Sequence, residues 1–232
     1  MAASAWPGRY AETGTFVALE GGEGAGKSTQ ARLLADALRA RGRDVVLTRE
    51  PGDTLVGARV RDLLLSPETG DMSARTEMLL YAADKAEHVD SLVAPALQRG
   101  AVVITDRYVD STLAYQGAGR VLSHAEVEHV ARWATADLRP HLTVLLDADP
   151  ATAFARFEGR DRIESAGAAF HQRVREGFLQ LAAADAERYL VIDAAGEPAA
   201  IAARILDRLD QLLETTGAAD ATGTAGAAGA RP

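Results

Sequence analysis

The stretch TFVALEGGEGAGKSTQARLLADALRAR, residues 15–41, decides the fold class of this chain. It begins with a short apolar run, continues into GGEGAGKS at 21–28, and ends in an amphipathic pattern with Leu34 and Leu38 on one face. GGEGAGKS matches G-x-x-x-x-G-K-[ST] in full, and the apolar run before it and the helical pattern after it are the context that this motif requires. The stretch therefore predicts a strand, a phosphate-binding loop and a helix.

The predicted loop can hold a nucleoside triphosphate through backbone and side-chain groups. Its glycines let successive N–H groups point at phosphate oxygens, and the helix that follows adds the positive end of its dipole. In this motif Lys27 reaches the β- and γ-phosphates, and the hydroxyl of Ser28 coordinates magnesium. The expected triphosphate-binding residues are Gly21, Gly22, Glu23, Gly24, Ala25, Gly26, Lys27, Ser28 and Thr29.

Further apolar runs repeat along the chain and alternate with longer helical patterns. They lie at 44–48, 101–105, 142–147 and 189–193. They show no polar alternation, as expected of strands that are covered on both faces. We therefore expect an α/β fold of three layers, α/β/α, with a five-stranded parallel sheet.

The organisation of the chain is predicted from its composition. The low-complexity ends, residues 1–14 and 215–232, cannot repay the entropy of ordering and are expected to be disordered. Residues 15–214 show no internal repeat and no evident linker. They are therefore expected to form a single domain.

The composition also excludes several classes of protein. Of the 232 residues, 25 are Lys or Arg and 33 are Asp or Glu, and this net charge of −8 argues against a nucleic-acid binder. Cysteine is absent, which excludes disulfides, thiolate zinc sites and cysteine nucleophiles. No apolar run reaches the ~18 residues of a membrane span, and residues 1–14 hold no signal-peptide segment. We expect a cytoplasmic protein with neither a membrane nor a nucleic acid as partner.

Charged residues just beyond the predicted strands mark a candidate site, because open parallel sheets bind ligands at that edge. TREPGDT at 48–54 and TDRYVDSTLAYQGAGR at 105–120 both lie there. Arg49 and Arg107 can clamp a second phosphate with their planar guanidinium groups. Asp106 lies where a carboxylate would assist a bound magnesium ion. Taken alone, Asp106 and Arg107 also fit a surface ion pair.

Two other segments complete the candidate site. On a predicted helix, Tyr81 and Lys85 are four residues apart and share a face, as a nucleobase pocket would need. Arg156, Arg160 and Arg162 lie in a glycine-flanked segment, about 156–168, that can close over a triphosphate as a mobile lid. Tyr81 alone also fits a core position, and the arginines alone also fit a solvated helix face.

The strings FVALEGGEGAGKSTQARLL, LTREPGDT, DRYVDSTLAYQGAGR and GRDRIE together resemble the bacterial thymidylate kinases, a family of P-loop nucleoside monophosphate kinases. The resemblance covers about residues 15–212. It implies a P-loop fold and transfer of a phosphoryl group from ATP, with Mg²⁺, to dTMP. Gly24 replaces an arginine found in the eukaryotic type, so the catalytic arginine is expected from the lid, at Arg160 or Arg162. The family also implies a homodimer that forms through helices including the long one at 75–97.

The resemblance also assigns roles to residues of the site. Lys27 and Arg107 are expected to be catalytic together with the lid arginines, Arg156 to contact ATP, and Ser28 and Asp106 to hold the metal. Tyr115 matches the aromatic residue that excludes a 2′-hydroxyl, and Tyr81 the residue that stacks on thymine. The residues expected to contact dTMP are Glu23, Arg49, Tyr81, Lys85, Arg107, Thr112, Tyr115 and Gln116.

Two positions depart from the family pattern. Asp53 stands where the family commonly has a second glycine, and Lys85 where an arginine usually contacts a thymine carbonyl. Lysine keeps the charge but loses the planar fork. A kinase for another nucleotide therefore stays an alternative.

A GTP-binding switch is disfavoured because a chain without asparagine cannot have the Asn-Lys-x-Asp motif. A metal hydrolase built on His124 and His129 is disfavoured because their spacing does not place them on one helix face.

Overall fold

The computed structural model describes residues 9–119, 122–153 and 161–223. At its centre is a five-stranded parallel sheet with the strand order β2-β3-β1-β4-β5. The strands are β1 (Thr15–Glu20), β2 (Val45–Arg49), β3 (Val102–Asp106), β4 (Leu142–Asp147) and β5 (Tyr189–Asp193). The structure confirms the predicted α/β fold, and each strand lies within a residue or so of the predicted apolar run.

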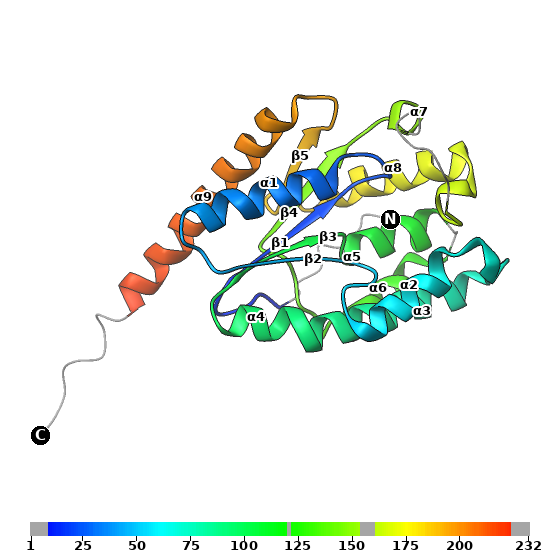
Figure 1. The fold of residues 1–232 in the computed structure, drawn as a ribbon, viewed down its shortest axis with the longest axis horizontal. Coiled ribbons are helices and arrows are strands. Elements are labelled where there is room, and N and C mark those ends of the chain that lie inside the picture. The colour runs from blue at the N-terminus through cyan, green and yellow to red at the C-terminus, as the bar shows by residue number, and fades with distance from the viewer. Residues whose placement is uncertain (1–8, 120–121, 154–160, 224–232) are drawn as a thin grey trace, which may run out of the picture.

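Helices cover both faces of this sheet (Figure 1). The longer helices are α1 (Lys27–Ala40), α2 (Leu55–Leu65), α3 (Ala74–His88), α6 (His124–Ala134), α8 (Ala168–Ala184) and α9 (Pro198–Gly223). The shorter helical segments are η1 (Pro67–Thr69), η2 (Val89–Val93), α4 (Ala94–Gln98), α5 (Val109–Thr112), η3 (Leu113–Gly119), α7 (Pro150–Ala153) and η5 (Glu164–Ala166). The long helix expected at 75–97 is formed by α3, η2 and α4 in direct succession.

The side chains of β1 show how the two layers are separated. Phe16 and Ala18 pack into the core beneath α3, α4 and α6, whereas Val17 and Leu19 pack against α1 and α9. All four side chains are buried. This burial on both faces explains why the strand reads as a continuous apolar run. Charged residues accordingly occupy only the last position of each strand, at Glu20, Arg49, Asp106, Asp147 and Asp193.

The structure describes part of each low-complexity end of the chain. Residues 1–8 and 224–232 lie outside the described residues. Residues 9–14 are packed: the N–H of Arg9 donates to Asp137 O at 2.7 Å, and Ala11 lies against the core. Helix α9 continues to Gly223, past the expected boundary at 214. Residues 9–14 thus contact the rest of the fold, and residues 215–223 form the end of α9. Contacts distant in sequence hold the first segment, and an uninterrupted helix contains the second.

Within the described part of the chain, no helix combines the length and apolar character needed to cross a membrane.

Candidate active site

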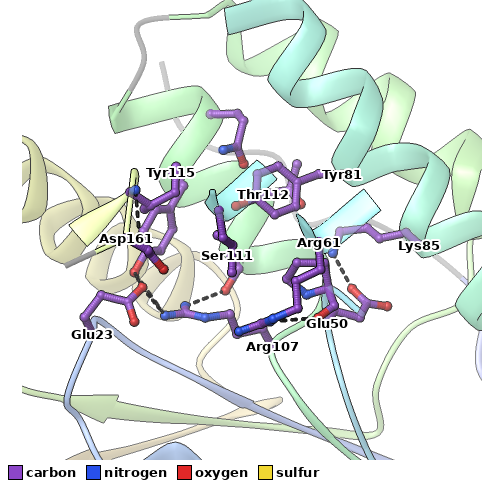
Figure 2. Close-up of a pocket in the computed structure, with 14 residues that line it drawn as sticks. Glu23, Glu50, Arg61, Tyr81, Lys85, Arg107, Ser111, Thr112, Tyr115 and Asp161 are labelled. Carbon is purple, nitrogen blue, oxygen red and sulfur yellow. Dashed lines mark hydrogen bonds and ion pairs between the residues drawn. The ribbon is translucent and has the colours of Figure 1, made fainter. Parts of the chain in front are cut away.

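Two adjoining pockets open at the C-terminal ends of β1, β2 and β3. The inner pocket is partly open to solvent. It is lined by Glu23, Glu50, Pro51, Arg61, Leu65, Tyr81, Lys85, Arg107, Ser111, Thr112, Tyr115, Gln116, Asp161 and Ile163 (Figure 2). The loop pocket is lined by Glu23, Gly24, Gly26, Lys27, Ser28, Thr29, Arg49, Glu50, Arg61, Asp106 and Arg107. The two pockets share Glu23, Glu50, Arg61 and Arg107, so these four residues form the boundary between them.

The loop pocket is built on the turn between β1 and α1. Gly26 has a φ of 87°, a left-handed conformation that favours glycine, and α1 begins at the next residue. The ammonium of Lys27 is buried and donates to Gly22 O at 2.7 Å. The hydroxyl of Ser28 donates to Asp106 Oδ2 at 2.5 Å across the loop. The structure thus brings together the expected phosphate lysine and both expected metal ligands.

Arg107 is the best-anchored cation of the site. Its guanidinium donates to Gly21 O and to Ser111 Oγ, each at 3.0 Å, and lies 5.0 Å from the ring centre of Tyr115. It also forms an ion pair of 2.6 Å with Glu23. Its φ of 72° is unusual for a residue with a side chain. Strained backbone of this kind persists where the surrounding structure fixes a functional side chain.

The ion pair with Arg107 keeps Glu23 ionised. Burial raises the pKa of Glu23, but Arg107 and Lys27 outweigh burial and hold it at about 2. The hydroxyl of Tyr115 also donates to Glu23 Oε1 at 2.9 Å. Glu23, Arg107 and Tyr115 therefore form one polar unit where the two pockets meet (Figure 2).

A buried carboxyl group supports this unit from below. Glu20, at the end of β1, accepts hydrogen bonds from the N–H of Tyr108 at 2.8 Å and from the hydroxyl of Ser111 at 2.6 Å. Because the hydroxyl hydrogen of Ser111 goes to Glu20, its oxygen is left to accept from Arg107. Burial and the nearby Asp110 raise the pKa of Glu20 to about 7. Glu20 thus fixes the direction of the hydrogen bond that anchors Arg107.

The raised pKa of Glu20 predicts a pH-dependent stability. A carboxyl group whose pKa is 4.5 in the unfolded chain and about 7 in the fold takes up a proton on folding between these values. Its contribution to the free energy of unfolding therefore falls as the pH rises through that window. Glu20→Gln removes this titration, so we expect the variant to gain stability relative to the wild type between about pH 5 and about pH 8. Urea unfolding at both pH values measures this difference, and a pH-independent difference would contradict the raised pKa.

The far wall of the inner pocket carries the residues expected to contact a base. Thr112 is buried, and its Oγ1 has no hydrogen-bond partner among the described residues. Burial raises the pKa of Tyr81, so its hydroxyl stays protonated. The side-chain amide of Gln116 donates to Glu77 Oε1 at 2.9 Å. All three side chains line the pocket, together with the expected Lys85.

Lys85 is engaged differently from the expected contact with a base carbonyl. Its ammonium forms an ion pair with Glu50 and donates to Tyr108 O at 3.0 Å. The side chain is only 2% exposed. At least two of its three N–H donors are thus used inside the protein. Lysine fits this place because a compact ammonium suits a buried carboxylate.

The structure describes two of the four arginines that were expected at the acceptor phosphate beside Arg107 or in the lid. Arg49 lines the loop pocket, with its side chain 57% exposed and its Nε 4.0 Å from Asp53 Oδ1. Arg156 and Arg160 lie outside the described residues. Arg162 lies on the side of α2 and α3, where it donates to Glu77 Oε2 at 2.5 Å. In this structure Arg162 is thus held beside the inner pocket, away from the phosphate-binding loop.

The pockets also contain residues that the sequence analysis did not single out. Arg61 of α2 donates to Pro51 O at 2.8 Å and lines both pockets. Ser111 supports Arg107, and Asp161 lines the inner pocket. Glu50 lies within the quoted TREPGDT string, which was the available signal for it. Arg61 belongs to no motif, so nothing in the sequence marked it.

Comparisons with known proteins agree with this geometry. The family model for thymidylate kinase matches residues 19–205. The thymidylate kinase of Cutibacterium acnes is 54% identical over 200 residues, covering 86% of this chain and 98% of the relative. That of Pseudomonas fluorescens is 49% identical over 205 residues, covering 87% and 98%. The crystal structure of thymidylate kinase from Ehrlichia chaffeensis aligns with a TM-score of 0.72 and 30% identity, covering 85% of this chain and 99% of that one. The chain therefore belongs to the thymidylate kinase family.

Proposed function

We propose that the two pockets divide the substrates of a thymidylate kinase between them. The chain transfers the γ-phosphoryl group of ATP to dTMP, giving ADP and dTDP. The phosphates of ATP bind in the loop pocket, and dTMP binds in the inner pocket. The single observation that carries this division is the shared wall, where Glu23 and Arg107 border both pockets. A phosphoryl group passing from one pocket to the other meets this wall.

Positioning and charge neutralisation account for the catalysis. The attacking oxygen belongs to the phosphate of dTMP, which is already anionic, so no general base is needed. Lys27 and the loop N–H groups neutralise the charge that develops on the transferred group, and Arg107 holds the acceptor phosphate in line. Arg49 lines the loop pocket next to Glu50 of the shared wall, and from there it would contact the acceptor phosphate where that phosphate meets the wall. The anchored guanidinium of Arg107 supports this role because it needs little reorganisation during the reaction.

The residues present also fit a magnesium ion. A hydroxyl and a carboxylate, from Ser28 and Asp106, lie side by side in the loop pocket, and such hard oxygen donors suit Mg²⁺. When bound with ATP, the ion neutralises charge on the β- and γ-phosphates. Ser28 and Asp106 would hold it, and Lys27 would act from the other side of the phosphates.

The base and sugar would be recognised on the far wall of the inner pocket. Tyr81 offers an aromatic face to thymine, and the buried Oγ1 of Thr112 is available to a polar atom of dTMP. Tyr115 is held by Glu23 and Arg107 and occupies the space that a 2′-hydroxyl would need. These contacts favour a deoxyribonucleotide with a thymine base.

An ADP-release assay with dTMP, dUMP, dCMP, dGMP and AMP tests this function. We expect dTMP to give the highest kcat/KM. A preference for another monophosphate would contradict the assignment of the inner pocket to thymidylate. Tight binding of GDP without acceptor-dependent turnover would contradict a kinase altogether.

Arg162 offers a separate test of the lid. Because it is bound to Glu77, which in turn binds Gln116, we expect Arg162→Ala to loosen the far wall of the inner pocket. The KM for dTMP should rise about three- to tenfold, as for the loss of a charged hydrogen bond, with a smaller change in kcat. Steady-state kinetics with dTMP as the varied substrate measure both parameters. A large fall in kcat with unchanged KM would instead make Arg162 the catalytic lid arginine, in place of Arg160.

The expected homodimer also stays a proposal. Leu79 of α3 and Trp133 of α6 are 60% and 80% exposed. They lie on adjacent helices of the same layer, and α3 is part of the long helical succession expected at the interface. A second copy would cover these apolar side chains, and the molecular mass in solution tests this.

A further inference from the structure

A chain of hydrogen-bonded side chains, buried except for the last, runs beneath the inner pocket. It begins at Lys85, whose ammonium is paired with Glu50. The other oxygen of Glu50, Oε1, lies 2.7 Å from Nδ1 of His88. The opposite ring nitrogen, Nε2, lies 2.7 Å from the hydroxyl of Thr48. Thr48 Oγ1 in turn lies 2.7 Å from Asp53 Oδ2. His88 and Thr48 are 1% and 4% exposed, so the two contacts of the ring are shielded from water, whereas Asp53 at the end of the chain has a side chain that is 36% exposed.

The hydrogens of this chain can be assigned by counting donors and acceptors. Ionised carboxylates only accept, and a threonine hydroxyl has one hydrogen to donate. Thr48 donates its hydrogen to Asp53, so the contact with His88 requires a hydrogen on Nε2. Glu50 stays ionised because Lys85 and His88 lower its pKa more than burial raises it. The contact with Glu50 therefore requires a hydrogen on Nδ1 as well.

We propose that His88 is held with both ring nitrogens protonated, and that it acts as a positioning residue between the Lys85–Glu50 pair and the loop that carries Arg49. The imidazolium donates from Nδ1 to Glu50 and from Nε2 to Thr48. A neutral ring has one donor only and would leave one of these buried contacts without a hydrogen. The ring thereby connects the end of α3 to the segment 48–54.

The charges around the ring suit a buried cation. Glu50 lies between two cations, the ring of His88 and the ammonium of Lys85. On the same helix, Asp84 accepts from the N–H of Gly52 at 3.0 Å. Burial and the nearby Glu50 raise the pKa of Asp84 to about 6. Asp53, in the loop, accepts the hydrogen bond of Thr48, whose oxygen contacts the ring of His88. The positive ring and ammonium are thus matched by carboxylates on both sides.

This arrangement depends on a residue that distinguishes the chain from the family pattern. The pattern commonly has glycine where this sequence has Asp53. With glycine, Thr48 would have no carboxylate to receive its hydrogen and could donate to an unprotonated Nε2. A neutral His88 would then satisfy both contacts. Asp53 is therefore the residue that makes the doubly protonated ring necessary here.

The consequence for the reaction rests on the proposed function. The segment 48–54 carries Arg49 and lines both pockets. It is tied to α3 at Thr48 and Glu50 through His88, and at Gly52 through Asp84. A looser segment would misplace Arg49 and weaken binding of the acceptor phosphate, with less effect on the chemical step.

Nitrogen NMR on the full wild-type chain tests the protonation directly. With ¹⁵N-labelled histidine at about pH 8, exposed histidines are neutral because their ordinary pKa is about 6.5. We expect both ring nitrogens of His88 to resonate as protonated nitrogens, with the signals assigned by their loss in His88→Gln. An unprotonated Nε2 in the wild type would overturn the proposal. This readout does not depend on activity, so it stands apart from any failure of the dTMP assay.

Replacement of Asp53 gives a second test of the proposal. Asp53→Ala frees the hydrogen of Thr48, and we expect the Nε2 signal to move to the unprotonated range while Nδ1 stays protonated. The KM for dTMP should rise about three- to tenfold, with kcat within about twofold of the wild type. Asp53→Asn keeps an acceptor oxygen and should restore both readouts. Asp36→Ala removes an equal charge from an exposed position on α1 and should leave both unchanged. A ring that stays doubly protonated in Asp53→Ala would overturn the role given to Asp53.

Discussion

Replacing Lys27 with alanine is expected to lower kcat by roughly two to three orders of magnitude, the usual cost of removing a pre-organised donor. Lys27 is the lysine of a complete phosphate-loop motif, and its ammonium already lies in the loop pocket, 2.7 Å from Gly22 O. No other lysine is available there, since Lys85 is the only other lysine of the chain and is paired with Glu50. We expect the loss in kcat rather than in the KM for dTMP, because dTMP binds in the neighbouring pocket.

Arg32→Ala provides the matched control for this variant. Arg32 lies on the same helix and is exposed, and its Nε donates to the backbone oxygen of Ser28 at 3.2 Å. Its removal changes the net charge equally but should leave kcat within about twofold of the wild type. Thermal unfolding of both variants checks that the fold is kept. Near-normal turnover in a folded Lys27→Ala protein would refute the assignment of the phosphate loop.

The sheet and the phosphate loop could be predicted because local sequence determines them. A strand buried on both faces must be apolar throughout, and the strands at 15–20 and 142–147 were located on that ground alone. The loop was predictable because its glycines, lysine and serine are needed at fixed spacing. The helix after it begins at Lys27, as the motif implies.

The contacts inside the site could not be predicted, because they join residues that are distant in sequence. Lys85 and Glu50 are 35 positions apart, and their pairing depends on how α3 packs over the end of β2. The rarity of lysine in the chain marked Lys85 as unusual, but the residue type alone did not distinguish a contact with a base from a buried ion pair. The same holds for Arg162, which pairs with Glu77 across 85 positions.

Backbone conformation was a second limit of prediction. Nothing in the residue type of Arg107 favours a φ of 72°, and that conformation directs its side chain toward Glu23. In the sequence, Glu20 is only the last residue of a predicted strand. In the structure it is the acceptor that fixes Ser111 beneath the arginine. Such supporting residues carry no motif, because any buried acceptor at that place would serve.

The second large effect is expected at Arg107. Arg107→Ala should lower kcat/KM for dTMP by roughly two to three orders of magnitude, with a rise in KM and a fall in kcat together. Both parameters should change because the guanidinium borders both pockets and would contact the acceptor phosphate before and during transfer. Alanine keeps the unusual backbone conformation without adding strain, so the comparison isolates the side chain. Steady-state kinetics with dTMP and with ATP as the varied substrate measure these changes.

Two further variants decide how Arg107 acts. Arg99→Ala removes an equal charge at an exposed ion pair with Asp44 and should leave both parameters unchanged. Glu23→Gln weakens the ion pair that orients Arg107, and it is combined with Arg107→Ala in a double variant. The fold-loss of kcat/KM in the double variant should be smaller than the product of the two single fold-losses, because the two residues act as a unit. A rise in KM with kcat unchanged in Arg107→Ala would contradict the role in transfer and leave Arg107 as a binding residue only. Multiplicative losses in the double variant would show that Glu23 acts on the substrates independently of the arginine that it holds in this structure.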